Sequence, residues 1–173
     1  MNHTFKRYLA ICLLTLLTFP AFAFDFKGIE LGKPSDPSTI YYELRARCSK
    51  GVNDYQICNG DVTIAGVSGI MNLVMDQAGI VIRISINFDS ENFDTVLPEV
   101  LNKFGTGKRS VFKVQNKMGA KFENIIYTWK KAGGLDLVLT KYAGNLDRSN
   151  IYFSTPADKA LLKDAGKAKA NDI

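Results

Sequence analysis

Histidine is almost absent from this chain of 173 residues, which has one histidine, His3, and three cysteines, Cys12, Cys48 and Cys58. We expect His3 and Cys12 to be removed with the first 23 residues. A mature chain without histidine cannot build Ser-His-Asp or Cys-His nucleophilic sites, or the common histidine metal sites. Paired carboxylates are the remaining catalytic option, but the acidic residues fall mostly at predicted caps, turns and helix surfaces. The sequence therefore predicts a protein that is not an enzyme and has no cofactor or metal.

The first 23 residues have the pattern of a secretory signal peptide. Lys6 and Arg7 give a basic start, residues 8–19 are apolar, and residues 21–23 read Ala-Phe-Ala, a small-x-small cleavage pattern. A lipoprotein signal built on Cys12 is the alternative, although that cysteine lies inside the apolar run and Ile11 precedes it. The apolar run is short for a membrane span. We expect a periplasmic or secreted chain with no transmembrane segment after cleavage.

Cys48 and Cys58 are the two thiols that remain after this cleavage. Disulfides form and persist in the oxidising compartments to which export leads. A redox pair is the less favoured alternative, because ten positions separate these cysteines whereas catalytic pairs have the C-x-x-C spacing. We therefore predict a structural disulfide between Cys48 and Cys58.

Charge is divided unevenly along the mature chain. Residues 24–100 contain 6 basic and 11 acidic residues, whereas residues 101–173 contain 14 basic and 6 acidic ones. Each half can simply be solvating its own surface. The alternative is a bipolar surface whose basic end attracts an acidic partner or an anionic polymer of the cell envelope. We expect no nucleic-acid partner, because the chain is exported.

The pattern of apolar residues predicts two helices and seven strands. Apolar residues recur at helical spacing over residues 37–48 and again over 93–104, where Pro98 either lies in the first turn of a helix that starts near Thr95 or kinks it. The clearest alternation runs over residues 80–88. The seven predicted strands are 62–67, 70–76, 80–88, 110–116, 122–131, 134–142 and 150–154.

This order of elements predicts an α+β protein with two short helices packed on one face of an antiparallel sheet. Helix, three strands, helix and four strands suggest two copies of one α-then-β plan, although no residues match between the halves. We assign residues 24–156 to one domain. The segment 157–173 is rich in Ala and Lys and is predicted to be a frayed helix or disordered.

The sheet face away from the helices is the candidate binding surface. If the isoleucines of residues 80–86 and the aromatic residues of 125–129 face the helices, the polar residues between them face outward. A cation, hydrogen-bonding groups and an aromatic ring then share one face, which suits docking to a protein or a glycan, although an ordinary solvated face is the alternative. The candidate binding residues on this face and at the basic end are Arg83, Asn87, Lys113, Thr128, Lys130 and Tyr142.

Several features together resemble a known group of proteins. They are the segment Phe26-x-Gly28-Ile29-x-Leu31-Gly32-x-Pro34, the Cys48 to Cys58 loop, a hairpin that turns at Gly79, the stretch 93–105 and Trp129. These features look like small uncharacterised exported bacterial proteins. The helix-then-sheet plan is more distantly similar to the β-lactamase-inhibitor-like modules related to the BamE/SmpA envelope proteins. Unlike the outer-membrane assembly lipoproteins, this sequence has no lipobox.

The resemblance implies a binding module and not a catalyst. The sequence thus leads to an exported binding protein that recognises a partner protein in the cell envelope, as an inhibitor or an envelope accessory factor. The alternative is association with an anionic envelope polymer or a membrane surface through the basic C-terminal half.

Overall fold

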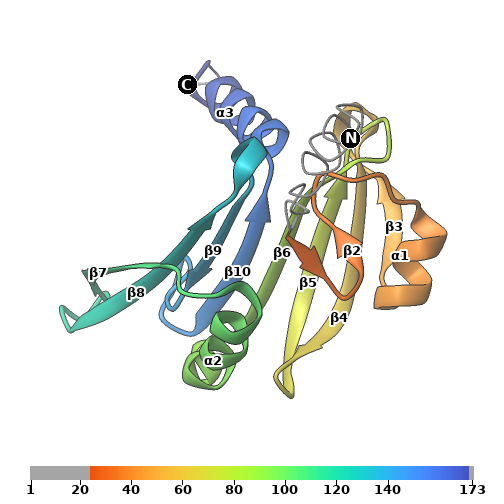
Figure 1. Ribbon diagram of the computed structural model, residues 1–173. Coiled ribbons are helices and arrows are strands. Elements are labelled where there is room, and N and C mark those ends of the chain that lie inside the picture. The colour runs from red at the N-terminus through yellow and green to blue at the C-terminus, as the bar shows by residue number, and fades with distance from the viewer. Residues whose placement is uncertain (1–23, 172–173) are drawn as a thin grey trace, which may run out of the picture.

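Eight antiparallel strands lie side by side in one sheet in the computed structural model, which describes residues 24–171. The predicted signal peptide lies outside the described residues. Figure 1 shows the sheet running from β3 on the right to β7 on the left. Across the sheet the strands are β3 (Arg47–Lys50), β4 (Gln56–Ile64), β5 (Val67–Met75), β6 (Val81–Asp89), β10 (Arg148–Ser154), β9 (Asp136–Thr140), β8 (Lys121–Lys130) and β7 (Lys108–Gln115).

The two halves of the chain form the two halves of this sheet. In each half a helix precedes four strands, and the last strands of the halves, β6 and β10, pair in the centre while the first strands, β3 and β7, form the outer edges. The α+β class predicted from the sequence is confirmed. The remaining elements are α1 (Pro37–Leu44), α2 (Phe93–Phe104), α3 (Pro156–Asn171) and a separate hairpin of β1 (Asp25–Phe26) and β2 (Ile29–Glu30).

The first helix is shorter than the predicted 37–48. The side chain of Asp36 accepts hydrogen bonds from the backbone N–H groups of Ser38 and Thr39 and so caps the start of α1. The helix ends at Leu44 because Arg45 has a left-handed backbone (φ 54°). The chain then continues as strand β3, so the predicted extension of the helix to residue 48 is wrong.

The segment from Cys48 to Cys58, which the sequence suggested was a loop, is largely strand, because β4 begins at Gln56 and pairs with both β3 and β5. Cys48 and Cys58 are directly opposite each other in the β3–β4 pair and form a disulfide. The predicted bridge is confirmed, and it joins two neighbouring strands.

The second helix covers the stretch in which the sequence predicted it, and the C-terminal segment is also helical. The helix α2 covers Phe93–Phe104 with Pro98 inside it, so of the two alternatives the start near Thr95 is wrong. A third helix, α3, covers residues 156–171, where the sequence suggested a frayed helix or disorder. Its N-terminal turn is capped, because the hydroxyl of Thr155 accepts a hydrogen bond from the backbone N–H of Asp158.

One face of the sheet carries the core. The strand β6 shows why: Ile82, Ile84 and Ile86 are buried, whereas Arg83 and Ser85 between them are partly exposed. The helices α1 and α2 contribute their apolar residues to the same core, and burying each large side chain contributes roughly 1.5–3 kcal/mol. The helix-side core includes Ile40, Leu44, Met71, Leu73, Phe93, Val96, Val100, Leu137, Leu139, Ile151 and Phe153. The other face of the sheet carries neither α1 nor α2, and we call it the open face.

Candidate binding surface on the open face

The strand register arranges the open-face side chains in rows that cross the sheet. Seven strands contribute one side chain each to a central row, and these side chains are exposed or half-buried. Because neighbouring strands lie about 4.8 Å apart, a seven-residue row spans about 29 Å. From β4 to β7 the central row consists of Asp61, Ile70, Asn87, Asn150, Thr140, Ile126 and Ser110.

Two large apolar side chains are exposed on this face. Ile70 on β5 is 60% exposed and Phe112 on β7 is 47% exposed. In the register they belong to opposite halves of the sheet, with β6, β10, β9 and β8 between their strands. Single exposed apolar side chains are common on protein surfaces, so these two indicate a binding surface only in combination with the other features of this face.

Polar side chains on the open face are held by hydrogen bonds to one another. The amide nitrogen of Asn150 donates to the Ser85 hydroxyl at 2.9 Å and to the Asn87 side-chain oxygen at 3.1 Å. Further toward the β3 edge, the Asn72 side chain donates to that of Asn59 at 2.9 Å. These bonds fix the rotamers of the amides, so a partner that docks here loses less side-chain entropy on binding.

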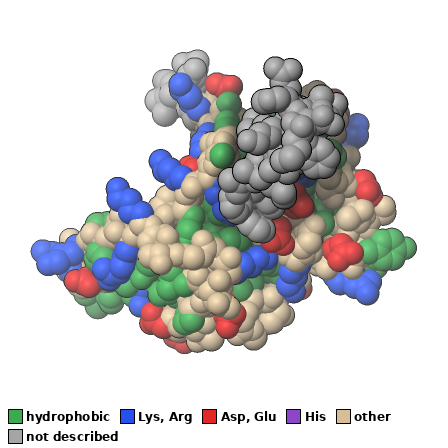
Figure 2. Space-filling view, viewed as in Figure 1, with side chains coloured by type: hydrophobic (Ala, Val, Ile, Leu, Met, Phe, Trp, Pro, Cys, Tyr) green, Lys and Arg blue, Asp and Glu red, His purple; other side chains and the backbone are tan. Residues whose placement is uncertain are grey.

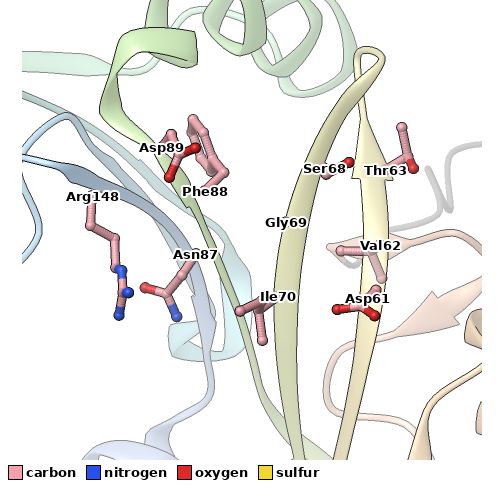
Figure 3. A pocket seen from close by; sticks show the side chains of 10 residues that line it. All are labelled: Asp61, Val62, Thr63, Ser68, Gly69, Ile70, Asn87, Phe88, Asp89 and Arg148. Atoms are coloured by element: carbon pink, nitrogen blue, oxygen red, sulfur yellow. The ribbon is translucent and has the colours of Figure 1, made fainter.

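A groove of about 450 Å³ hollows one end of this face, where β4, β5, β6 and β10 meet. Figure 3 shows Arg148 on one side of the groove, Asn87 beside it, and Ile70 and Asp61 across it. Within residues 24–171, the Arg148 guanidinium makes no ion pair. The groove therefore offers two carboxylates, Asp61 and Asp89, together with an amide, a guanidinium and an apolar side chain, and Asp89 is opposite Arg148 in the register.

Arg83, one of the predicted binding residues, is engaged by the chain itself. Its guanidinium pairs with the fully buried Asp158 of α3, with nitrogen to oxygen distances of 2.5 and 2.7 Å. The Tyr152 hydroxyl donates to the other Asp158 oxygen at 2.5 Å. The Arg83 side chain is only 18% exposed. Its ion pair fixes the first turn of α3 at the end of the open face opposite the groove.

This cluster shifts the ionisation of its members. Burial by itself would lower the pKa of Arg83, but the hydrogen bond and the charge of Asp158 outweigh burial and raise that pKa. Burial and the hydrogen bond to Asp158 raise the pKa of Tyr152 well above its ordinary value. Both groups therefore keep the protonated forms that the cluster requires throughout the neutral range.

Four of the other predicted binding residues lie on the open face. Asn87 lies in the central row, and Thr128 and Lys130 project from β8 on the same side of the sheet. The Tyr142 ring contacts that of Phe122, with 6.2 Å between the ring centroids. The backbone N–H of Tyr142 donates to the side-chain oxygen of Asn124, and the backbone C=O of Tyr142 accepts from the side-chain nitrogen of Asn124, both at 2.9 Å. These four residues share a face but do not gather at one point on it.

Lys113 lies apart from this group. It is on the edge strand β7, opposite Glu123 in the register, and the alternation of side chains places it on the helix side of the sheet. Its side chain is exposed, as are those of Lys108 and Arg109 on the same strand. Figure 2 shows Lys and Arg side chains at the left of the molecule, where Figure 1 places β7. Because each half of the chain forms one half of the sheet, the charge imbalance along the sequence is also an imbalance between the β3–β6 half of the sheet and the β7–β10 half.

Sequence reasoning did not select Ile70, Phe112 or Arg148. Alternation could have predicted that Ile70 lies on the open face, because Met71 and Leu73 lie on the helix side. Phe112 follows in the same way from the strand predicted at 110–116. Arg148 could not be found, because it starts β10, two residues before the strand predicted at 150–154.

Across residues 24–171 there is no group of three or more His, Cys, Asp and Glu side chains that could hold a metal ion. No helix in that range is long and apolar enough to cross a membrane. Comparison with protein families, with curated proteins and with solved structures found no significant match to this chain.

Proposed function

We propose that this chain is an exported, non-catalytic binding protein that recognises a partner protein through the open face of its sheet. The observation that carries the proposal is the combination on this face of exposed Ile70 and Phe112 with amides held by their own hydrogen bonds. Apolar anchors supply the energy of association, and fixed polar groups supply its specificity. An inhibitor or an envelope accessory factor would use such a surface.

The size of the open face supports a protein partner. Seven interstrand spacings of about 4.8 Å make the sheet about 34 Å wide, and seven residues along a strand span about 24 Å. The product is about 800 Å², which is the area that one partner contributes to a standard protein interface. A small ligand would need an enclosed pocket, whereas the groove beside Arg148 is one open part of a broader surface.

The polar groove suggests how the partner is positioned. A partner carboxylate could pair with the Arg148 guanidinium, while its apolar side chains cover Ile70. Asp61, which also lines the groove, would favour a basic group close by. This end of the interface would therefore combine an apolar contact at Ile70 with charged groups of both signs.

The disulfide supports export as part of this proposal. A Cys48–Cys58 bridge between neighbouring strands persists in an oxidising compartment such as the periplasm or the exterior of the cell. The signal pattern in residues 1–23 points to the same compartment. The partner is therefore to be sought among proteins of the cell envelope.

Capture of the partner with paired variants tests the proposal. The tagged chain, produced with its own leader, serves as bait in envelope extracts, and bound proteins are identified by mass spectrometry. We expect Ile70→Glu/Lys130→Glu to lose a protein that the wild type retains, because both changes alter the open face. The matched control is Tyr42→Glu/Lys33→Glu, which changes one exposed apolar residue and one exposed lysine away from that face.

Two results would contradict the proposal. One is equal capture by the wild type and the open-face variant while the control variant loses the protein. The other is capture of envelope fragments from which all protein has been digested, because that result identifies an anionic polymer as the partner.

A further inference from the structure

The strand β7 forms an unusually open edge of the sheet. It runs for eight residues, from Lys108 to Gln115, pairs on one side only, with β8, and keeps an unbroken register along its length. Both of its faces are exposed, because Val111 on the helix side is 40% exposed and Phe112 on the open face is 47% exposed. No other described strand pairs with its outer side.

The alternation of hydrogen bonds identifies which backbone groups of β7 point outward. The Asn116 N–H donates to the Ala120 carbonyl across the β7–β8 turn. Because bonded and non-bonded pairs alternate in an antiparallel ladder, Val114, Phe112 and Ser110 bond to β8. The N–H and C=O groups of Arg109, Val111 and Lys113 therefore point to the outer edge, free to pair with an added strand.

The opposite edge of the sheet is different. Its outer strand, β3, is four residues long, packs against α1 and carries the disulfide to β4. Short, covered edges of this kind resist pairing with other chains. The β7 edge has no proline and no bulge, and its own protection is positive charge.

That charge selects what can pair with β7. Lys108, Arg109 and Lys113 lie on the strand and none of them makes an ion pair with another described residue. Lys117 and Lys121 follow at the turn. A second copy of the chain would bring lysine and arginine against lysine and arginine, which destabilises directly paired strands. An acidic strand would bring opposite charges together.

We propose that β7 accepts an extended acidic segment of a partner protein as a ninth strand of the sheet. Arg109 and Lys113 lie on the helix side of β7 with Val111 between them, so they face two side chains that are four residues apart on the added strand, and these should be acidic. The side chains of the added strand that project to the open face, next to Phe112, should be apolar. This inference rests on the proposed function, whose partner it describes as a protein with an exposed acidic segment of alternating pattern.

A synthetic peptide tests the inference directly. The probe is a fluorescein-labelled peptide of nine residues with alternating Glu and Val, and its fluorescence anisotropy is measured during titration with the full chain. We expect saturable binding that weakens with added salt, and no binding of the corresponding Lys and Val peptide. In antiparallel pairing, opposite charges across two strands favour the first peptide and like charges exclude the second.

A proline variant separates strand addition from simple charge attraction. Val111→Pro removes an N–H that points to the outer edge and leaves the β7–β8 hydrogen bonds intact. We expect it to weaken binding of the acidic peptide at least tenfold. The matched control is Val111→Thr, which keeps the N–H and the branched side chain and should bind within twofold of the wild type. Circular dichroism and the melting temperature confirm that both variants are folded.

Four results overturn the inference. Equal binding by Val111→Pro and the wild type shows that the peptide is attracted by charge alone. Absence of peptide binding to the folded wild type removes the site. Self-association in sedimentation equilibrium that Val111→Pro abolishes identifies a second copy as the occupant. If the open-face variant loses the captured partner and Val111→Pro retains it, the edge-strand inference fails while the proposed function stands.

Discussion

Arg83 and Asp158 lie 75 residues apart in the sequence, and their side chains form an ion pair at 2.5 Å that attaches α3 to the centre of the sheet. Asp158 is fully buried, and Tyr152 donates a hydrogen bond to its second oxygen. A residue expected to bind a partner is thereby a structural residue. Variants that test binding on the open face should therefore not substitute Arg83, because its loss would also disturb the attachment of α3.

Removing the carboxylate of this pair should destabilise the fold strongly. Asp158→Ala leaves the guanidinium of Arg83 without its partner, and losing one member of a buried pair costs roughly 3–5 kcal/mol. Because Arg83 is 18% exposed, we expect the lower end, about 3 kcal/mol, in urea unfolding. Lys163→Ala, an exposed change in the same helix, should cost less than about 0.5 kcal/mol. Equal stability of the two variants would show that the pair does not hold α3 in place.

The hydrogen bond from Tyr152 should make stability depend on alkaline pH. The folded-state pKa of Tyr152 is raised, whereas the unfolded side chain ionises near pH 10. Above about pH 10 the unfolded chain binds fewer protons than the folded one, so the free energy of unfolding decreases as pH rises. Tyr152→Phe removes this contribution.

The difference in unfolding free energy between wild type and Tyr152→Phe should therefore be constant below about pH 9 and shrink between pH 10 and 12. Urea unfolding at pH 8, 10 and 11 measures it, with the exposed Tyr42→Phe as the control. A difference that stays constant to pH 11 would show that the Tyr152 hydroxyl is not held in its protonated form.

The close approach of Gly107 to Trp129 predicts a steric effect. A Cβ atom at position 107 would lie 2.5 Å from the indole carbon Cε2, and the indole N–H donates to the Gly105 carbonyl at 2.8 Å. Gly107→Ala should destabilise the protein by about 1–3 kcal/mol, as overpacking does. It should also shift the emission of the single tryptophan. In a Trp129→Leu background, Gly107→Ala should lower the free energy of unfolding by less. An equal loss in both backgrounds would show that the substitution does not act through contact with Trp129.

The disulfide should contribute measurably to stability. It closes a loop of ten positions, for which the chain-entropy relation gives about 3 kcal/mol. We expect Cys48→Ser/Cys58→Ser to lower the free energy of unfolding by about that amount. The free energy of unfolding of the wild type, measured with a reductant, should equal that of the double variant. If the reductant also lowers the stability of the double variant, its effect does not come from this disulfide.

The local patterns of the sequence were enough to predict much of the sheet. Strict alternation over residues 80–88 predicted β6, because a half-buried strand needs apolar residues at every second position. The strand β3 could not be predicted in this way, since its four residues are mostly polar. The helical spacing continued through Cys48, and nothing in the sequence marked Arg45 as the left-handed residue that ends α1.

The candidate surface was predictable only in part. Alternation decides which side of a strand a residue faces, so it placed Asn87 and Thr128 correctly on the open face. It does not reveal which distant residue a side chain meets. Asp158 lies in a segment that the sequence suggested was frayed or disordered, so its pairing with Arg83 depended on tertiary contacts that no local pattern encodes.

Site-specific photo-crosslinking tests the central claim most directly. A photoreactive amino acid replaces either Ile70, which is 60% exposed on the open face, or Tyr42, which is 71% exposed on α1, and intact cells that produce the full chain are irradiated. We predict a discrete crosslinked protein product from position 70 and none from position 42. The same product from both positions, or from position 42 alone, would contradict recognition through the open face.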